Sequence, residues 1–426
     1  SRYRFIEAVV QTSVKKVRQK GEKTWTDRID AVVTHKFWAF PVFLAMLAVM
    51  FWCTFGPIGS GLSDLLAAVI ENGVEPAVRS ALGGIGAAPW AVSLVCDGVI
   101  AGVGGVLTFL PMIAILFLFL SILEDSGYMA RAAFVMDRTL RHFGLSGKAF
   151  IPLLMGFGCT VPAVMGARTM ENEKDRRMTI MLVPFMSCSA RLPIYGLLVS
   201  AFFPGNRALI VISLYLIGIC LAILSGLILK RSIFRGEAAP FLLELPPYRM
   251  PTVRNVGTHV WEKVKDFLSR AATLILAMSV VLWLLQSFTL HGQYTTDVSQ
   301  SLLAALGSAI APLFLPCGFG VWQAAVALLT GLIAKEAVVS SMSLFYGFSL
   351  TASGATVALA LGGTFTPVAA YAFLVFCALY TPCVAAIATI RREMGDIKWT
   401  LACLGWQLGM AYLASMLVYQ IGSLLF

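Results

Sequence analysis

Long apolar stretches, separated by short charged segments, dominate the chain. Four of them cover residues 37–58, 107–123, 208–229 and 271–288. Their length is close to the roughly 20 residues that an α-helix needs to cross a bilayer. None of them alternates with the period of two that a barrel strand requires. The pattern predicts an all-α polytopic membrane protein with about 8 transmembrane helices.

The charges between these stretches predict sidedness, because Lys and Arg accumulate in cytoplasmic segments. Residues 1–36 carry nine Lys or Arg, residues 230–270 carry eight and residues 391–398 carry three, so these segments and the N-terminus are predicted to be cytosolic. Residues 57–90 carry one Arg against three acids, and residues 291–320 carry neither Lys nor Arg. Both are expected outside, and the same count places the C-terminus outside.

For two apolar stretches, this count places both flanking segments on the same side of the membrane. Residues 149–166 have basic segments on both sides, while residues 321–347 begin outside and are followed by a span that must also begin outside. Each stretch should therefore be broken or re-entrant. The chain then reads as two inverted gate-type repeats, an arrangement that places the substrate near the bilayer midplane.

The predicted organisation has five parts. They are a cytosolic amphipathic linker (1–36), a first transmembrane helix with an external segment (37–90), a first gate repeat (91–230), a cytosolic amphipathic connector (231–270), and a second gate repeat with a C-terminal transmembrane helix (271–426).

Composition excludes several other classes of protein. With 58% hydrophobic and 13% charged residues, the chain has too little polar surface for a soluble globule. The net charge of +10 resides in short segments between apolar runs, without an aromatic-basic stripe, so it indicates lipid headgroups rather than nucleic acid. Nine cysteines occur without a Cys-x-x-Cys pair, so neither a zinc ribbon nor a disulfide framework is indicated.

The densest chemical signal is Gly-Phe-Gly-Cys-Thr-Val-Pro over residues 156–162. Gly156, Gly158 and a proline bracket Cys159 and Thr160, so the helix should break at the cysteine. A thiol beside unpaired carbonyls suits Fe(II) or another borderline divalent metal. A packed cysteine beside a packing glycine is the alternative interpretation.

A second cluster lies between Pro184 and Pro193, where Ser187, Cys188 and Ser189 precede Arg191. The prolines again predict an interrupted helix. An arginine in an apolar segment is costly unless it is paired, so it should bond to carbonyls of the broken helix or to an acid such as Glu124 or Asp125. The alternative is an arginine that snorkels to the interface.

The second unit carries corresponding signals. Thr381 and Cys383 stand where the first unit has its Ser-Cys-Ser, and Lys335 and Glu336 interrupt otherwise apolar sequence. One of the two charges is expected to face the transport pathway while the other neutralises a neighbour. A structural ion pair between the repeats is the alternative.

Glu124 and Asp125 end a predicted span, where they could gather cations at the cytosolic mouth or cap the helix that follows. The charged run over residues 168–177 is interpreted as a solvated loop. The remaining cysteines are expected to be packing residues: Cys53, Cys96, Cys220, Cys317, Cys377 and Cys403.

Five of these motifs resemble, in the same order, the permease motifs of the FeoB family of bacterial ferrous iron transporters. They are Leu-Glu-Asp-Ser-Gly-Tyr-Met-Ala-Arg (123–131), the run over 156–162, Met-Ser-Cys-Ser-Ala-Arg-Leu (186–192), Ala-Lys-Glu (334–336) and Tyr-Thr-Pro-Cys-Val (380–384). The resemblance covers essentially the whole chain. It implies Fe2+ as transported substrate, handled by cysteines that fall on Cys159, Cys188 and Cys383.

The resemblance also implies partners and a location. Family members carry an N-terminal GTPase domain, but Gly-x-x-x-x-Gly-Lys-Ser/Thr does not occur in this sequence, so GTP and Mg2+ are expected to act only through that missing domain. The chain itself is expected to be a transporter and not an enzyme. Small FeoA- and FeoC-like proteins, a homo-oligomer, and a place in the bacterial cytoplasmic (inner) membrane are the further expectations.

Two classes of rival function remain. One is a transporter of another divalent metal or of a nucleoside-like solute, since gate-type repeats are not unique to iron. The other is a membrane anchor for a GTPase, against which the intramembrane charges of Arg191, Lys335 and Glu336 argue, because an anchor has no need to bear their cost.

Overall fold

The computed structural model describes residues 25–35, 37–142, 145–234, 248–249, 251–295, 297–348 and 354–425. Within these ranges the chain is helical and has no β-strand, only an isolated bridge between Phe288 and Tyr294. Seven helical stretches are long and apolar enough to cross a membrane, or up to eight if one sharply bent pair counts as a span. The all-α polytopic membrane class is therefore confirmed.

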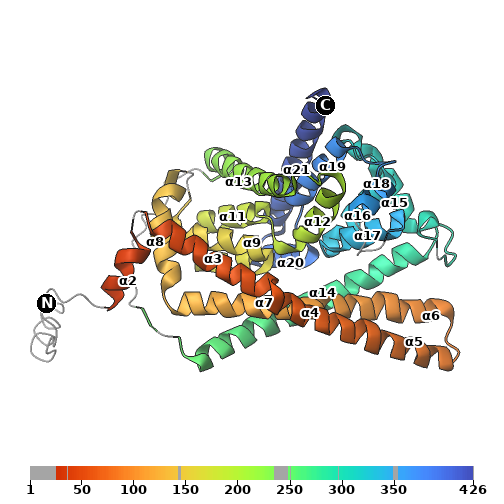
Figure 1. The fold of residues 1–426 in the computed structure, drawn as a ribbon, viewed down its shortest axis with the longest axis horizontal. Helices are drawn as coiled ribbons and strands as arrows, with labels where there is room; N and C mark the ends of the chain where they lie inside the picture. The colour runs from red at the N-terminus through yellow and green to blue at the C-terminus, as the bar shows by residue number, and fades with distance from the viewer. Residues whose placement is uncertain are drawn as a thin grey trace, which may run out of the picture.

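Long helices line one side of the molecule (Figure 1). A nearly continuous run over Ala39–Gly84 contains α3 (Ala39–Phe55), α4 (Pro57–Val69), η1 (Ile70–Val74) and α5 (Glu75–Gly84). Pro57 is tolerated because it occupies the first turn of α4, where its missing N–H would have no partner anyway. The segment expected to lie outside after the first span is thus helical as far as Gly84.

The next long helices pack against that run. They are α6 (Pro89–Ser93), η2 (Leu94–Ile100) and α7 (Ala101–Asp125), followed by α14 (Val253–Ser287), and α14 lies along α7. Gly102 allows close approach, because a Cβ there would lie 2.2 Å from Ser279 Oγ. The connector predicted over 231–270 and the span after it share one helix from Val253 onward.

The other side of the molecule consists mostly of shorter helices, with the long helices α13 and α21 among them (Figure 1). The first group is α8 (Tyr128–His142), η3 (Gly147–Ala149), α9 (Phe150–Gly158), α10 (Thr160–Gly166), η4 (Ala167–Thr169), α11 (Glu173–Leu182), η5 (Val183–Phe185), η6 (Ser189–Arg191), α12 (Leu192–Phe202) and α13 (Arg207–Ser232). The second is η7 (Val298–Gln300), α15 (Leu302–Ile310), η8 (Ala311–Cys317), α16 (Trp322–Ile333), α17 (Ala337–Tyr346), α18 (Gly354–Leu361), α19 (Pro367–Leu379), α20 (Val384–Met394) and α21 (Ile397–Leu425).

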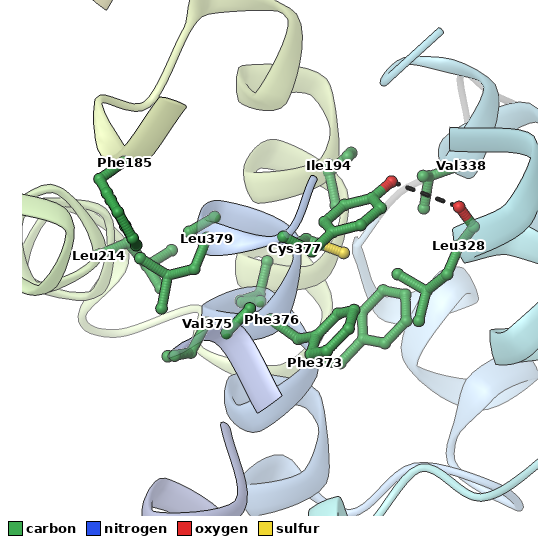
Figure 2. Close-up of a cluster of buried hydrophobic side chains, with 14 of the residues drawn as sticks. Phe185, Ile194, Leu214, Leu328, Val338, Phe373, Val375, Phe376, Cys377 and Leu379 are labelled. Atoms are coloured by element: carbon green, nitrogen blue, oxygen red, sulfur yellow. Dashed lines mark hydrogen bonds between the residues drawn. The ribbon is translucent and has the colours of Figure 1, made fainter. Parts of the chain in front are cut away.

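The core of this side surrounds α19, whose residues from Ala372 to Leu379 are all buried. Figure 2 shows side chains of both predicted repeats around it: Phe185, Ile194 and Leu214 from the first, and Leu328 and Val338 from the second. Phe376 also stacks on Tyr380, with ring centroids 5.4 Å apart. The two repeats therefore share one apolar core.

The broken stretches that the sequence predicts are present. Cys159 has extended backbone (φ −152°, ψ 133°) between α9 and α10, and Ala334 is extended after α16. The helical pair Leu302–Cys317 and Trp322–Ile333 bends by 103°. The inverted orientation of the repeats stays a prediction, as do the domain boundaries. Of the linker predicted over 1–36, residues 1–24 and 36 lie outside the described residues.

Gly318 gives a test of the packing between η8 and α21. Its φ is +83°, and a Cβ at this position would lie 2.1 Å from the ring of Tyr419. Gly318→Ala combines backbone strain with a steric clash, so we expect a loss of about 2–4 kcal/mol of stability, seen as a lower thermal unfolding midpoint in detergent. Gly405→Ala is the control, because its Cβ would meet nothing within 4 Å. Equal midpoints for the two variants would contradict this packing.

Candidate functional site

Four interruptions of helical backbone lie in the apolar interior, and they coincide with four of the motifs singled out from sequence. The first break is at Cys159, the second spans residues 186–188, the third spans residues 334–336 and the fourth spans residues 380–383. A break frees N–H and C=O groups that a continuous helix would pair, and in apolar surroundings those groups need new partners. The side chains at the breaks supply many of them.

The first break lies between α9 and α10, where glycines allow close packing. A Cβ at Gly156 would lie 3.0 Å from the Met186 side chain, and one at Gly158 would lie 3.2 Å from Leu116. Thr160 begins α10 and is buried. The predicted break at Cys159 is confirmed. Because Gly156 has no side chain, the end of α9 packs directly against Met186 in the second break.

Hydrogen bonds join the second break to the first, and others lie within the second break. Ser189 Oγ donates a hydrogen bond to the Gly158 carbonyl oxygen at 3.1 Å, which joins the two breaks. Arg191 is 1% exposed and donates to the carbonyl oxygens of Met186 (3.1 Å) and Pro184 (3.2 Å). Of the two partners expected for this arginine, the broken-helix carbonyls are therefore the correct one.

Ser187 lies in the same break and faces α12. Its hydroxyl lies 2.9 Å from the hydroxyl of Tyr195, and both side chains are buried. This pair satisfies two polar groups that would otherwise be unpaired in the apolar interior. The loop before η6 is therefore fixed on both sides, by Arg191 and by Ser187.

Lys335 joins the third and fourth breaks. Its Nζ donates to the Thr381 carbonyl oxygen at 2.6 Å and lies 3.1 Å from the centroid of the Tyr380 ring. Tyr380 in turn donates to the Leu328 carbonyl oxygen at 3.5 Å, the dashed line in Figure 2. Both bonds lie within the second repeat. Lys335 thus joins the two breaks of the second repeat, and Ser189 joins the two breaks of the first.

Glu336 differs from its neighbour. Its side chain is half-buried, and among the salt bridges of the described residues neither Glu336 nor Lys335 takes part. The structural ion pair between repeats that the sequence left open is thus not formed.

The three candidate thiols are brought together by the four breaks. Cys159 and Cys383 pack against the same small cluster of Val161, Ala385 and Ala386. Cys188 is close enough to interact electrostatically with both. In the part of the chain that the structure describes, however, no group of three or more His, Cys, Asp or Glu is arranged to hold a metal ion. The thiols are neighbours without forming a closed metal site.

A cavity of about 880 Å³ lies between α7, α8, α10 and the first half of α14. Its wall is mostly apolar and includes Met155, Pro162 and Met165 from α9 and α10. Glu124 lines it and pairs with Lys263 at 3.1 Å, and Asp125 lies 3.6 Å from His259 Nδ1. Both carboxylates thus pair with basic residues of α14, and Glu124 does so at the cavity wall.

Arg168 lies at the same cavity, at the far end of α10. Its Nε is 2.7 Å from both carboxylate oxygens of Glu393, at the end of α20, and this hydrogen bonding raises the pKa of the guanidinium. Arg168 is exposed, as expected for the solvated loop predicted over residues 168–177, but it is ion-paired, and the loop prediction is wrong from Glu173, where α11 begins. Sequence gave no sign of a partner 225 positions away.

Comparisons with known proteins place the chain in a family. The model described as "Nucleoside recognition" (Gate) matches residues 106–202 and 268–397, more than half of the chain. These two segments contain all four breaks. The model described as "Ferrous iron transport protein B C terminus" matches residues 211–263, between them.

Curated relatives align with nearly all of the chain. The "Fe(2+) transporter FeoB" of Staphylococcus aureus (strain COL) is 44% identical over 99% of this chain and 63% of its own length. That of Methanocaldococcus jannaschii is 38% identical over 100% of this chain and 63% of its own length. A Porphyromonas gingivalis "Fe(2+) transport protein A/Fe(2+) transporter FeoB fusion protein" is 39% identical over 100% and 55%.

The chain thus spans less than two thirds of the length of these relatives. No solved structure gives a significant match. The motifs, the two family models and the full-length alignments agree with one another, and the chain belongs to the FeoB family.

Proposed function

We propose that this chain is the membrane part of a ferrous iron transporter and carries Fe2+ across the cytoplasmic membrane. The observation that carries the proposal is the meeting of four broken helices, with the thiols of Cys159, Cys188 and Cys383, inside a protein whose relatives are named Fe(2+) transporters. Soft sulfur ligands beside free carbonyl oxygens suit a borderline divalent metal.

The pathway we propose runs through the breaks to the cavity. Fe2+ loses water at the breaks, where carbonyl oxygens and one or two thiols replace it, and then passes Glu124 and Asp125. The open arrangement of the thiols supports this, because ligands that hold an ion too tightly would trap it. Gly156, Gly158, Thr160, Ser187, Ser189 and Thr381 shape the breaks.

The proposed pathway brings Fe2+ close to basic side chains. Arg191 is a buried cation near the thiols and would repel Fe2+, and Lys335 is a second buried basic side chain there. Both donate hydrogen bonds to carbonyl oxygens, so we assign them to holding the backbone rather than to the ion. In this proposal the carboxylate of Glu336 compensates part of the positive charge of Fe2+ as the ion passes.

The partners are part of the proposal. GTP and Mg2+ would act through a GTPase domain or subunit that is not among these residues, and the P. gingivalis fusion supports a FeoA-like partner. A FeoC-like protein and a homo-oligomer are proposed on the family resemblance. The N-terminus is proposed to be cytosolic on the charge count of residues 1–36.

Cysteine substitutions test the pathway. In proteoliposomes that contain an Fe2+-sensitive dye, Cys188→Ser and Cys383→Ser should each lower the initial rate of Fe2+ uptake by about tenfold or more, because a soft ligand is lost. Cys220→Ser is the control, since that thiol is exposed on α13, away from the breaks. Equal rates for all three variants would rule out the cysteine pathway.

Glu336→Gln keeps the size of the side chain and removes its charge. Uptake of Fe2+ should fall several-fold in the same assay, because the ion would pass Arg191 and Lys335 without a compensating carboxylate. Glu171→Gln, at an exposed acid that pairs only with Lys148, should leave the rate unchanged. A Glu336→Gln variant as fast as the parent protein would remove this residue from the pathway.

A nucleoside-like solute is the alternative that the "Nucleoside recognition" description of the matching family model suggests, although the relatives named Fe(2+) transporters do not favour it. Competition separates the two candidates. Uptake of Fe2+ should be inhibited by Zn2+ or Mn2+, which use similar ligands, and should be unaffected by nucleosides. Inhibition by nucleosides alone would favour the second candidate.

A further inference from the structure

Two half-helices, one from each segment that matches the gate family model, lie side by side. α10 begins directly after Cys159 and α20 begins directly after Cys383, and the starts of both helices pack around Val161, Ala385 and Ala386. α10 and α20 are in contact. Each therefore has a candidate thiol at its N-terminal end.

The opposite ends of these half-helices are joined by a salt bridge. Arg168 follows α10 and Glu393 lies in the last turn of α20. The Glu393 side chain is 7% exposed, and the guanidinium binds it through Nε and one terminal nitrogen, the two-pronged geometry that makes such pairs strong. Among the salt bridges of the described residues, this one alone joins residues 106–202 to residues 268–397.

We propose that Arg168 and Glu393 form a latch, which holds α10 against α20 and keeps Cys159 and Cys383 from opening to the cavity. In transport the latch opens to let the ion reach the cavity and closes again behind it. This inference rests on the proposed function for its role in transport, but the latch itself is a property of the two half-helices. Arg168 and Glu393 are positioning residues, since they act through the cysteine-bearing ends.

The geometry makes opening feasible. α20 has 11 residues, or about 16 Å at 1.5 Å per residue, so a rigid shift of the helix at its latched end also displaces the end that bears Cys383. Arg168 also interacts electrostatically with Asp266 of α14, and both residues line the cavity. When Glu393 is released, Arg168 has a second acid nearby, so opening does not leave its charge without a partner.

The direct test is the accessibility of Cys159 in detergent-solubilised full chain. A polar maleimide is added, and mass spectrometry of peptides follows the labelling rate of each cysteine. In Arg168→Gln and in Glu393→Gln the labelling of Cys159 should rise about threefold or more relative to the parent protein, a modest shift in the open population. The charge-swapped double variant Arg168→Glu/Glu393→Arg should return it toward the parent rate, which a merely destabilised protein would not do.

A matched control uses the pair Arg177–Glu173, which lies within one helix. Glu173→Gln should leave the labelling of Cys159 unchanged, because this acid is exposed and its partner lies in the same helix. The labelling of exposed Cys220 should be the same in every variant. If both latch variants label Cys159 at the parent rate, the latch is overturned.

Uptake of Fe2+ by the same variants separates the latch from the proposed function. Single variants with an altered rate, restored by the charge swap, would support both. If no protein, including the parent, takes up Fe2+ while labelling still responds to the latch, the iron proposal fails and the latch stands. If the parent protein takes up Fe2+, and the single variants match it both in uptake rate and in the labelling of Cys159, the latch fails and the iron proposal stands.

Discussion

Hydrogen bonding of the backbone at the four breaks is the constraint on which the rest of this structure depends. An apolar interior offers no water, so each carbonyl freed by a break must find a donor within the protein. Arg191 and Lys335 meet this need with long basic side chains, and Ser189 meets it with a hydroxyl. Because these donors come from other breaks or from the same loop, the breaks stabilise one another and assemble in one place.

The features that depend on local chemistry could be predicted from the sequence. Glycine and proline around Cys159 predicted a break, and the structure has extended backbone there. Apolar length predicted membrane helices, and the described residues contain seven, or up to eight, helices that are long and apolar enough to cross a bilayer. Arg191 was expected to need carbonyls or an acid, because its cost in an apolar segment is a property of the residue itself.

Other features depend on residues far apart in the chain, and sequence could not supply them. The bond from Lys335 to Thr381 spans 46 positions, and Arg168 finds Glu393 only because α10 and α20 pack together. Charge counts predict the side of the membrane on which a segment lies, but they do not distinguish a loop from a helix. Residues 57–84 are predicted to be external by their acids, and they continue the helical run, since polar side chains on one face do not end a helix.

The length of α14 has a mechanical consequence. Its 35 residues extend about 52 Å, well beyond the roughly 30 Å of a hydrocarbon core. One end is held to α7 by Lys263 and Glu124, and the other end by the bond from Trp283 to Ser93. α14 has no break along these residues, so a movement of its polar first turns is passed to its far end through one continuous helix, with no hinge between them.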